Sequence, residues 1–395
     1  MSGGDAGSAA EGARSAGGTG DGSGGIGGDA SGGTSDVGGT NSSGEAGAPQ
    51  GAGGSLGGNG AGGESGSTEA GSGGGDCQGG EVYDYTATNQ AELEALRGVT
   101  VVGALTVTDA VTDLSALSCL RSVDWLQIYQ ARQLTTLSGL SSLVNAQVLL
   151  VQDNPELENL EGLGNVSVTR TLSIDLNPKL TSLVGLENVG QVETFVISLN
   201  GSLTSLDGLE SLTGVEILSL VGNPELVSVA ALGRVTSVRT LYFIDHERFE
   251  TLAGFENLRV TSELHVEQNA NLKSLAGVNV PPELNGITLV NNPALESLEA
   301  LAGLTAARYE LLLNDCDSLT NLAGLEALGS VGALSISQNG ALEDLRGLAG
   351  LSSAASLDIQ HNAALPECEA SWLRDRLEVA EVVISDNGES GPCPP

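Results

Sequence analysis

Histidines are the first side chains to consider for chemistry, because an imidazole can act as a general base or as a metal ligand. The chain has 395 residues and three histidines, His246, His265 and His361. His246 stands where a repeated asparagine is expected, and the other two fall at separate outward positions of predicted strands. We therefore predict no catalytic residues, no metal site and no cofactor.

Carboxylates offer the second route to chemistry. Enzymes that cleave polysaccharides on a right-handed β-helix need paired carboxylates, or lysine and arginine groups, converging on one groove. Acidic residues do occur at outward strand positions, but they are dispersed along the chain: Asp175, Asp245, Glu267, Asp315 and Asp358. A solvated acidic face is the interpretation we favour, and a β-helix enzyme is the alternative.

Asparagines recur with a spacing that points to structure rather than catalysis. They are Asn154, Asn177, Asn200, Asn223, Asn269, Asn292, Asn339 and Asn362, with Asn387 near the end. The spacing reflects a repeat of 23 residues, clearest from Leu172 to Val192. An amide both donates and accepts hydrogen bonds, so a stack of asparagines can satisfy backbone groups where each coil turns. We predict a structural asparagine ladder.

The rest of the repeat predicts the elements that hold this ladder. Leu172 and Ile174 alternate with polar residues, as in a strand with one buried face. Apolar residues then recur every third residue, which suits 3₁₀ turns better than the mixed spacing of an α-helix. A glycine follows at a fixed position, for example Gly185, where a tight bend or close packing is expected. The sequence therefore predicts a mainly β fold, a parallel β solenoid of about 13 coils with little regular helix.

The repeated unit LxIxxNxxLxxLxGL resembles a leucine-rich repeat. Its asparagine-to-leucine spacing of three makes it most similar to the receptor L-domain type, found in growth-factor receptor ectodomains and in tethered, exported myxobacterial proteins. The resemblance covers roughly residues 77 to 393 and implies a binding scaffold, because such solenoids host many binding roles.

The five cysteines fall near the ends of the repeat region, except Cys316. Cys368 and Cys393 have equal positions in successive coils, which stack about 4.8 Å apart, so we predict a disulfide between them; two buried thiols are the alternative. Cys77–Cys119 is a second predicted pair, although their positions in the repeat do not match. Cys316 takes an asparagine position, where we expect a buried thiol. Disulfides at the caps would indicate an oxidising compartment.

Composition divides the chain in two. Residues 1–76 hold 31 of the 57 glycines and almost no large apolar side chain, which predicts a disordered, acidic Gly/Ser-rich tether. Residues 77–395 form the predicted solenoid, with an N-terminal cap at 77–104 and a C-terminal cap at 366–395. The net charge of −35 argues against a nucleic-acid partner.

The location of the protein is inferred from the cysteines and the tether. No apolar run is long enough to span a membrane, and Met1 opens directly into glycine-rich sequence. We expect the natural start to lie upstream, with an export signal and a lipid-anchor cysteine, so that the protein is held at the cell surface or outer membrane. A cytoplasmic protein is the alternative.

One set of outward strand positions is apolar rather than polar, and we predict a contiguous binding patch there. Its residues are Leu150, Leu176, Val196, Leu199, Val221, Tyr242 and Ile244. The competing interpretation is that another part of the chain covers this face. The function that follows is a non-catalytic, monomeric binding module for a protein or glycan, and the alternative is a structural envelope spacer without a discrete ligand.

Overall fold

The computed structural model describes residue 77 and residues 79–388, which belong to one compact unit. The predicted tether, residues 1–76, and Cys393 lie outside the described residues. The disulfide between Cys368 and Cys393 therefore stays a prediction.

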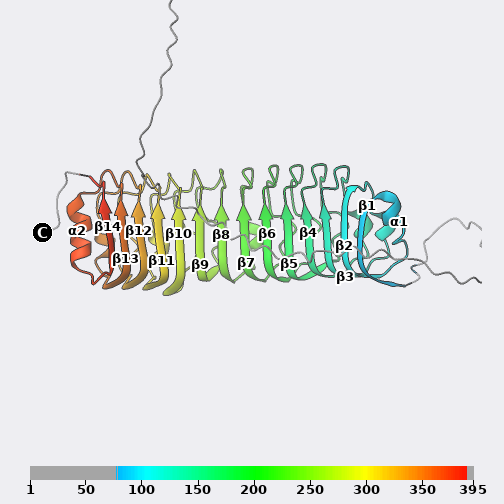
Figure 1. The fold of residues 1–395 in the computed structure, drawn as a ribbon, viewed down its shortest axis with the longest axis horizontal. Coiled ribbons are helices and arrows are strands. Elements are labelled where there is room, and N and C mark those ends of the chain that lie inside the picture. Colours follow the sequence, from blue (N-terminus) through cyan, green and yellow to red (C-terminus); the bar gives the residue numbers. More distant parts are fainter. Residues whose placement is uncertain (1–76, 78, 389–395) are drawn as a thin grey trace, which may run out of the picture. The chain divides into compact units, whose positions relative to one another are not determined.

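A single sheet of fourteen parallel strands runs the length of the described chain, and the strands lie side by side in chain order (Figure 1). This arrangement confirms the predicted mainly β solenoid. The strands are β1 Glu81–Asn89, β2 Val101–Ala110, β3 Ser122–Tyr129, β4 Asn145–Gln152, β5 Ser167–Asp175, β6 Gln191–Ser198, β7 Gly214–Val221, β8 Ser237–Ile244, β9 Arg259–Glu267, β10 Glu283–Val290, β11 Ala306–Asn314, β12 Ser330–Ser337, β13 Ser353–Gln360 and β14 Glu381–Ser385.

The strand register follows the sequence repeat. We number positions within a coil from its leading apolar residue, so Leu172 is at position 0 and Asn177 at position 5. Leu172 pairs with Leu149 on one side and Phe195 on the other, and the leading residues stay opposite each other from Leu105 to Val382. β1 joins as a full rung, with Tyr85 opposite Leu105. Like positions thus form columns along the solenoid.

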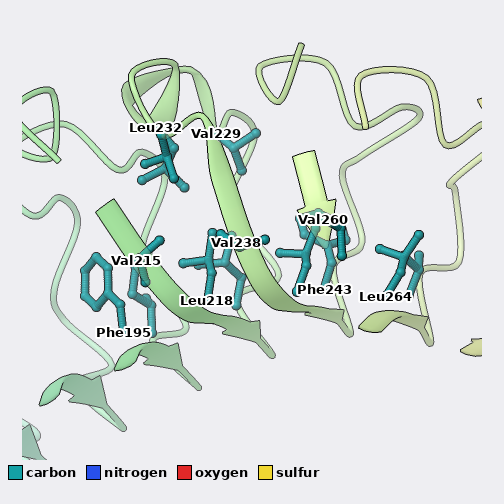
Figure 2. Close-up of a cluster of buried hydrophobic side chains, with 14 of the residues drawn as sticks. Phe195, Val215, Leu218, Val229, Leu232, Val238, Phe243, Val260 and Leu264 are labelled. Carbon is teal, nitrogen blue, oxygen red and sulfur yellow. The ribbon is translucent and has the colours of Figure 1, made fainter. Parts of the chain in front are cut away.

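The core is a continuous stack of mainly aliphatic side chains, because positions 0 and 2 of the strands from β2 to β13 are buried. Figure 2 shows part of this stack, with Phe195, Leu218 and Leu264 at position 0. The position three residues before the leading leucine is buried too, as at Val215 and Val238. The fully buried aromatic rings of the described residues lie in the middle coils, where Phe243 contacts Phe249 and Phe255 edge-on. A coil cannot bury this face alone, so neighbouring coils must stabilise each other.

The return path of each coil carries little helix, as the three-residue spacing predicts. Short 3₁₀ segments occur at Ser115–Leu117, Ser138–Leu140, Ala230–Leu232, Glu299–Leu301 and Arg346–Leu348. Two α-helices lie at opposite ends of the sheet, α1 at Gln90–Glu94 and α2 at Glu367–Asp375 (Figure 1). A helical turn at Glu369–Leu377 is expected from the sequence, and α2 begins and ends two residues earlier.

The asparagine ladder forms as predicted. The side chain of Asn177 is fully buried, and its Nδ2 donates to the carbonyl oxygen of Val151 at 2.9 Å. Its Oδ1 accepts from the backbone N–H of Asn154 at 3.3 Å and from the Nδ2 of Asn154 at 3.2 Å. One amide therefore joins two coils, and each next asparagine repeats the pattern.

The ladder is interrupted at two coils whose side chains lack an amide. Buried His246 places Nδ1 3.2 Å from the carbonyl oxygen of Asn223 and Nε2 3.2 Å from that of Leu220. Buried Cys316 keeps its Sγ 3.8 Å from the carbonyl oxygen of Leu289. Cys316 is a free thiol, as the sequence predicts. The amides thus form three separate chains rather than one.

The repeated glycine permits close packing between coils. Gly208 has a φ of +108°, and a Cβ built there would lie 2.2 Å from the carbonyl oxygen of Leu183 in the preceding coil. No other residue type fits without moving backbone. The expected tight packing at this position is confirmed.

A disulfide joins Cys77, in the predicted N-terminal cap, to Cys119 in the coil that follows, with a Cα–Cα distance of 5.4 Å. This pairing was predicted without matching positions in the repeat. The first coils are shorter than 23 residues, since Leu105 leads one coil and Leu126 the next. The pairing therefore could not be derived from column positions.

Candidate functional site

The candidate site is the outer surface of the sheet, which we call the strand face. It comprises the outward positions of each coil: the residue before the leading leucine, and positions 1, 3 and 4. On β8 these residues are Thr240, Tyr242, Ile244 and then Asp245. Because the strands pair in register, each position forms a column that crosses the whole sheet.

Position 3 brings two of the predicted patch residues together. Val221 on β7 lies directly opposite Ile244 on β8, and both are half-buried. Two parallel neighbours of this kind pack side by side on the sheet surface. They form the centre of the apolar part of the strand face.

Position 1 places the other predicted patch residues in an alternating column. Leu150, Val196 and Tyr242 are separated by Ser173 and Ser219 on the strands between them. The predicted patch is therefore not one unbroken apolar surface. Leu150 stands apart, whereas Val196 and Tyr242 flank the strand that carries Val221.

A polar network on β4 to β6 separates Leu150 from the rest. The hydroxyl of Ser173 donates to the carboxylate of Asp175, and the hydroxyl of Ser198 donates to the same carboxylate at 2.6 Å. The side chain of Gln152 donates to Asp175 at 3.1 Å. Asp175 and Ser173 are buried, so this acid is satisfied internally and is not a free solvated group.

Position 4 has an unusual backbone conformation in every coil from β2 to β14. The φ angle there is positive, for example +60° at Asp245 and +54° at Asn291. Asparagine, aspartate and glycine tolerate this left-handed conformation best. At two coils the residue is leucine: Leu176 has a φ of +55° and is 46% exposed, and Leu199 has a φ of +55° and is 49% exposed.

These two leucines lie beside each other on the strand face. The N–H of Leu176 donates to the carbonyl oxygen of Ser198, and Leu199 directly follows Ser198. The side chain of Leu199 extends over Gly222, where a Cβ would lie 2.7 Å from its Cδ2. The apolar part of the strand face thus consists of Leu176, Leu199, Val196, Val221, Tyr242 and Ile244.

An acidic group adjoins this apolar part on β9. His265 lies opposite Tyr242, and the two rings stack with centroids 4.6 Å apart. Glu263 and Glu267 flank His265, each with a carboxylate oxygen 3.8 Å from an imidazole nitrogen. The Nε2 of His265 is buried and has no hydrogen-bond partner among the described residues.

Burial changes the proton affinity of two groups here. It raises the pKa of the Glu267 carboxyl above its ordinary value, and the charge of His265 opposes this rise. Burial also raises the pKa of the Tyr242 phenol, and the charge of Glu263 adds to the effect. Both shifts follow from removing a charged form from water.

Glycine at position −1 of β10 brings two further carboxylates near each other. A Cβ added to Gly286 would lie 3.5 Å from Cγ of Glu310 and 4.0 Å from Cγ of Glu263. The two side chains thus lean over Gly286, which is itself buried. Sequence reasoning missed this pair because it considered only positions 1, 3 and 4. The alternation of a strand places position −1 on the same face, and that signal could have found it.

The remaining chemistry-bearing residues do not assemble into a second site. The predicted outward acids Asp245, Asp315 and Asp358 lie on different coils, and His361 lies 3.4 Å from Asp386 at the far end. Within residues 77 and 79–388, no three histidine, cysteine or acidic side chains are placed to hold a metal ion. None of the described helices is long and apolar enough to cross a membrane.

No family model matches the chain, and no curated protein matches it. Among solved structures, one described as the crystal structure of a TLR13–ssRNA13 complex is similar over 80% of this chain and 74% of that chain, with 12% identity and a TM-score of 0.24. The functional argument therefore rests on the residues of this chain.

Proposed function

We propose that this protein is a non-catalytic binding module that holds a protein partner against the apolar part of its strand face. The observation that carries the proposal is the pair Leu176 and Leu199. They are half-exposed leucines in a left-handed conformation, which costs an L-residue roughly 1–2 kcal/mol. Neither folding nor solubility benefits from them, whereas a binding surface does.

The side chains favour a protein over a glycan. Leucine, valine and isoleucine form most of the apolar part, and they are suited to packing against aliphatic side chains of a partner. Sugar rings are bound mainly by flat aromatic surfaces and polar groups, and Tyr242, the one aromatic residue of this part, is already stacked on His265. A glycan partner, an envelope spacer and a polysaccharide-cleaving enzyme are the alternatives.

The proposed location is an exported one, at the cell surface and held by the glycine-rich segment. The Cys77–Cys119 disulfide supports an oxidising environment. A lipid anchor upstream of Met1 and a monomeric state belong to the same proposal. Nucleic acid is not the proposed partner, because a net charge of −35 repels a phosphate backbone.

A pair of photo-crosslinking variants tests the proposal. Benzoylphenylalanine is placed either at Leu199 or at Val227, which is 56% exposed but lies beyond the strand face. Irradiation in the native cell extract should give a discrete protein adduct from position 199 and none from position 227. Unlabelled wild-type chain should suppress the adduct by competition.

The matched competitor is the double variant Leu176→Asn with Leu199→Asn. Asparagine already occupies position 4 at Asn291, so the variant should fold at least as stably as the wild type. It should nevertheless fail to compete for the adduct. Equal competition by this variant, or no adduct from position 199, would reject the binding proposal and favour a spacer.

A further inference from the structure

The charge distribution on the strand face identifies the chemistry of the partner. From β2 to β14 no lysine or arginine occupies position −1, 1, 3 or 4, whereas carboxylates recur there, among them Asp153, Asp245 and Asp358. The lysine and arginine residues of the same coils lie at other positions.

Three basic side chains in the turns beyond the strands, Lys179, Arg248 and Lys273, pair with a glutamate of the neighbouring coil. Lys179 pairs with Glu156 at 2.5 Å, and Arg248 pairs with Glu225 at 2.5 Å. Both pairs lie at position 7, in the turns after the ladder. The carboxylates of the strand face have no such cationic neighbours, apart from histidine. The face therefore presents a negative surface to an approaching molecule.

The negative surface is continuous with the apolar part. Tyr242 and Ile244 on β8 lie directly opposite His265 and Glu267 on β9, and Glu263 leans over Gly286 on β10. Ile244 on β8 lies two strands from Gly286 on β10, about 10 Å across the sheet, and four residues from it along the strand direction, about 13 Å, so the apolar and acidic contacts are roughly 16 Å apart.

Gly286 lets the two acids approach each other. Its position holds no side chain, and Glu263 on β9 and Glu310 on β11 lean over it and bury it. Two carboxylates over a glycine match the forked donors of a guanidinium, or the three donors of an ammonium. The unpaired Nε2 of His265 borders the same group of acids.

We infer that the partner is a cationic polypeptide segment that places an arginine or lysine against Glu263 and Glu310 and an aliphatic side chain on Val221 and Ile244. A separation of roughly 16 Å corresponds to about five residues of an extended chain running diagonally across the strands. The segment should therefore carry an aliphatic residue about five positions from a basic one. This inference rests on the proposed function and specifies the partner that the same surface would hold.

The test uses random 12-residue peptides displayed on phage and selected against the full-length protein. Selected peptides should be enriched in an aliphatic residue about five positions from arginine or lysine. A synthetic peptide of that sequence should bind about tenfold more weakly when Glu263→Gln and Glu310→Gln are combined, since each loses a charge-assisted contact. Its affinity should also fall with rising salt.

The matched control removes the same charge from the same face. Asp358→Asn with Glu381→Gln changes two carboxylates at positions 1 and −1 of β13 and β14, far from β10, and should alter the affinity less than twofold. An equal loss in both double variants would mean that only net charge matters, and would overturn the inference.

The outcomes separate this inference from the proposed function. One result would overturn the cationic partner and leave the binding face standing. In that result the selected peptides bind the Leu176→Asn, Leu199→Asn variant less well, but they lack basic residues or bind the Glu263→Gln, Glu310→Gln variant unchanged. Peptides indifferent to all of these variants, or no enrichment at all, would count against both.

Discussion

Truncation of one ladder asparagine tests how the coils are held together. Asn177→Ala removes an amide whose Nδ2 donates to the carbonyl oxygens of Val151 and Asp175 at 2.9 Å each. The change also removes the acceptor of the backbone N–H of Asn154. All of this lies in the fully buried interior of the turn.

The expected loss follows from the groups left without partners. The carbonyl oxygen of Val151 loses its amide donor and the N–H of Asn154 loses its acceptor, and each buried group that loses its partner costs roughly 1–3 kcal/mol. We expect Asn177→Ala to lower the free energy of unfolding by about 4 kcal/mol, measured by urea denaturation at pH 7.

Asn387 provides a control with two of the same three bonds to the backbone and less burial. Its Oδ1 accepts from the backbone N–H of Asn362 at 3.2 Å and its Nδ2 donates to the carbonyl oxygen of Ile359 at 2.9 Å. Because Asn387 is half-buried, water can replace these bonds, and Asn387→Ala should cost about 1 kcal/mol.

Amide hydrogen exchange supplies the second readout. Exchange should accelerate most in β4 and β5, the strands beside the missing amide, because each coil depends on its neighbours. A loss below about 1 kcal/mol for Asn177→Ala, or equal losses for the two variants, would refute the view that burial of the ladder, and not merely its bonds, stabilises the stack.

Three further predictions concern the ladder and the packing between coils. Cys316→Asn should raise the free energy of unfolding, measured in urea, by about 1–2 kcal/mol. An amide at this position can donate to the carbonyl oxygen of Leu289 and restore the broken chain of amides. In the wild type, burial raises the pKa of the Cys316 thiol to about 12, so iodoacetamide should label this thiol only after unfolding. Burial lowers the pKa of His246 below 6.5, so the unfolded chain binds the proton more readily than the folded chain. Stability should therefore fall as the pH drops below about 6.5. His246→Asn should flatten that part of the curve of stability against pH, and an unchanged slope would show that His246 does not cause the fall. Gly208→Ala should destabilise by at least roughly 2 kcal/mol, whereas Gly201→Ala, where a Cβ meets nothing within 4 Å, should change the melting temperature little.

The fold could be predicted because its determinants are local and periodic. A column of leucines at a spacing of 23 residues, as from Leu149 to Leu172, can be buried only if the coils stack in that register. The ladder followed from the chemistry of an amide at a fixed position. The glycine followed from its lack of a side chain, and Gly208 shows the reason in its contact with the preceding coil.

The candidate site could be predicted only in part. Sequence position placed Val221 and Ile244 on one face. Whether the apolar surface is continuous, however, depends on the residues of the strands between the apolar ones. Ser173 and Ser219 lie on such strands and interrupt the surface. The left-handed conformation at Leu176 was equally hidden. It arises from the turn that delivers the following asparagine into the ladder, which no propensity of leucine would indicate.

The two interruptions of the ladder have a mechanical consequence. A pull on the ends of the solenoid loads every junction between coils in series, and the weakest junction yields first. The chain of amides is broken between Asn223 and His246 and again between Asn292 and Cys316. These are the two weaker junctions in an otherwise regular stack of coils. Under tension the solenoid should therefore part into blocks of several coils, in a few large steps, rather than unwind one coil at a time.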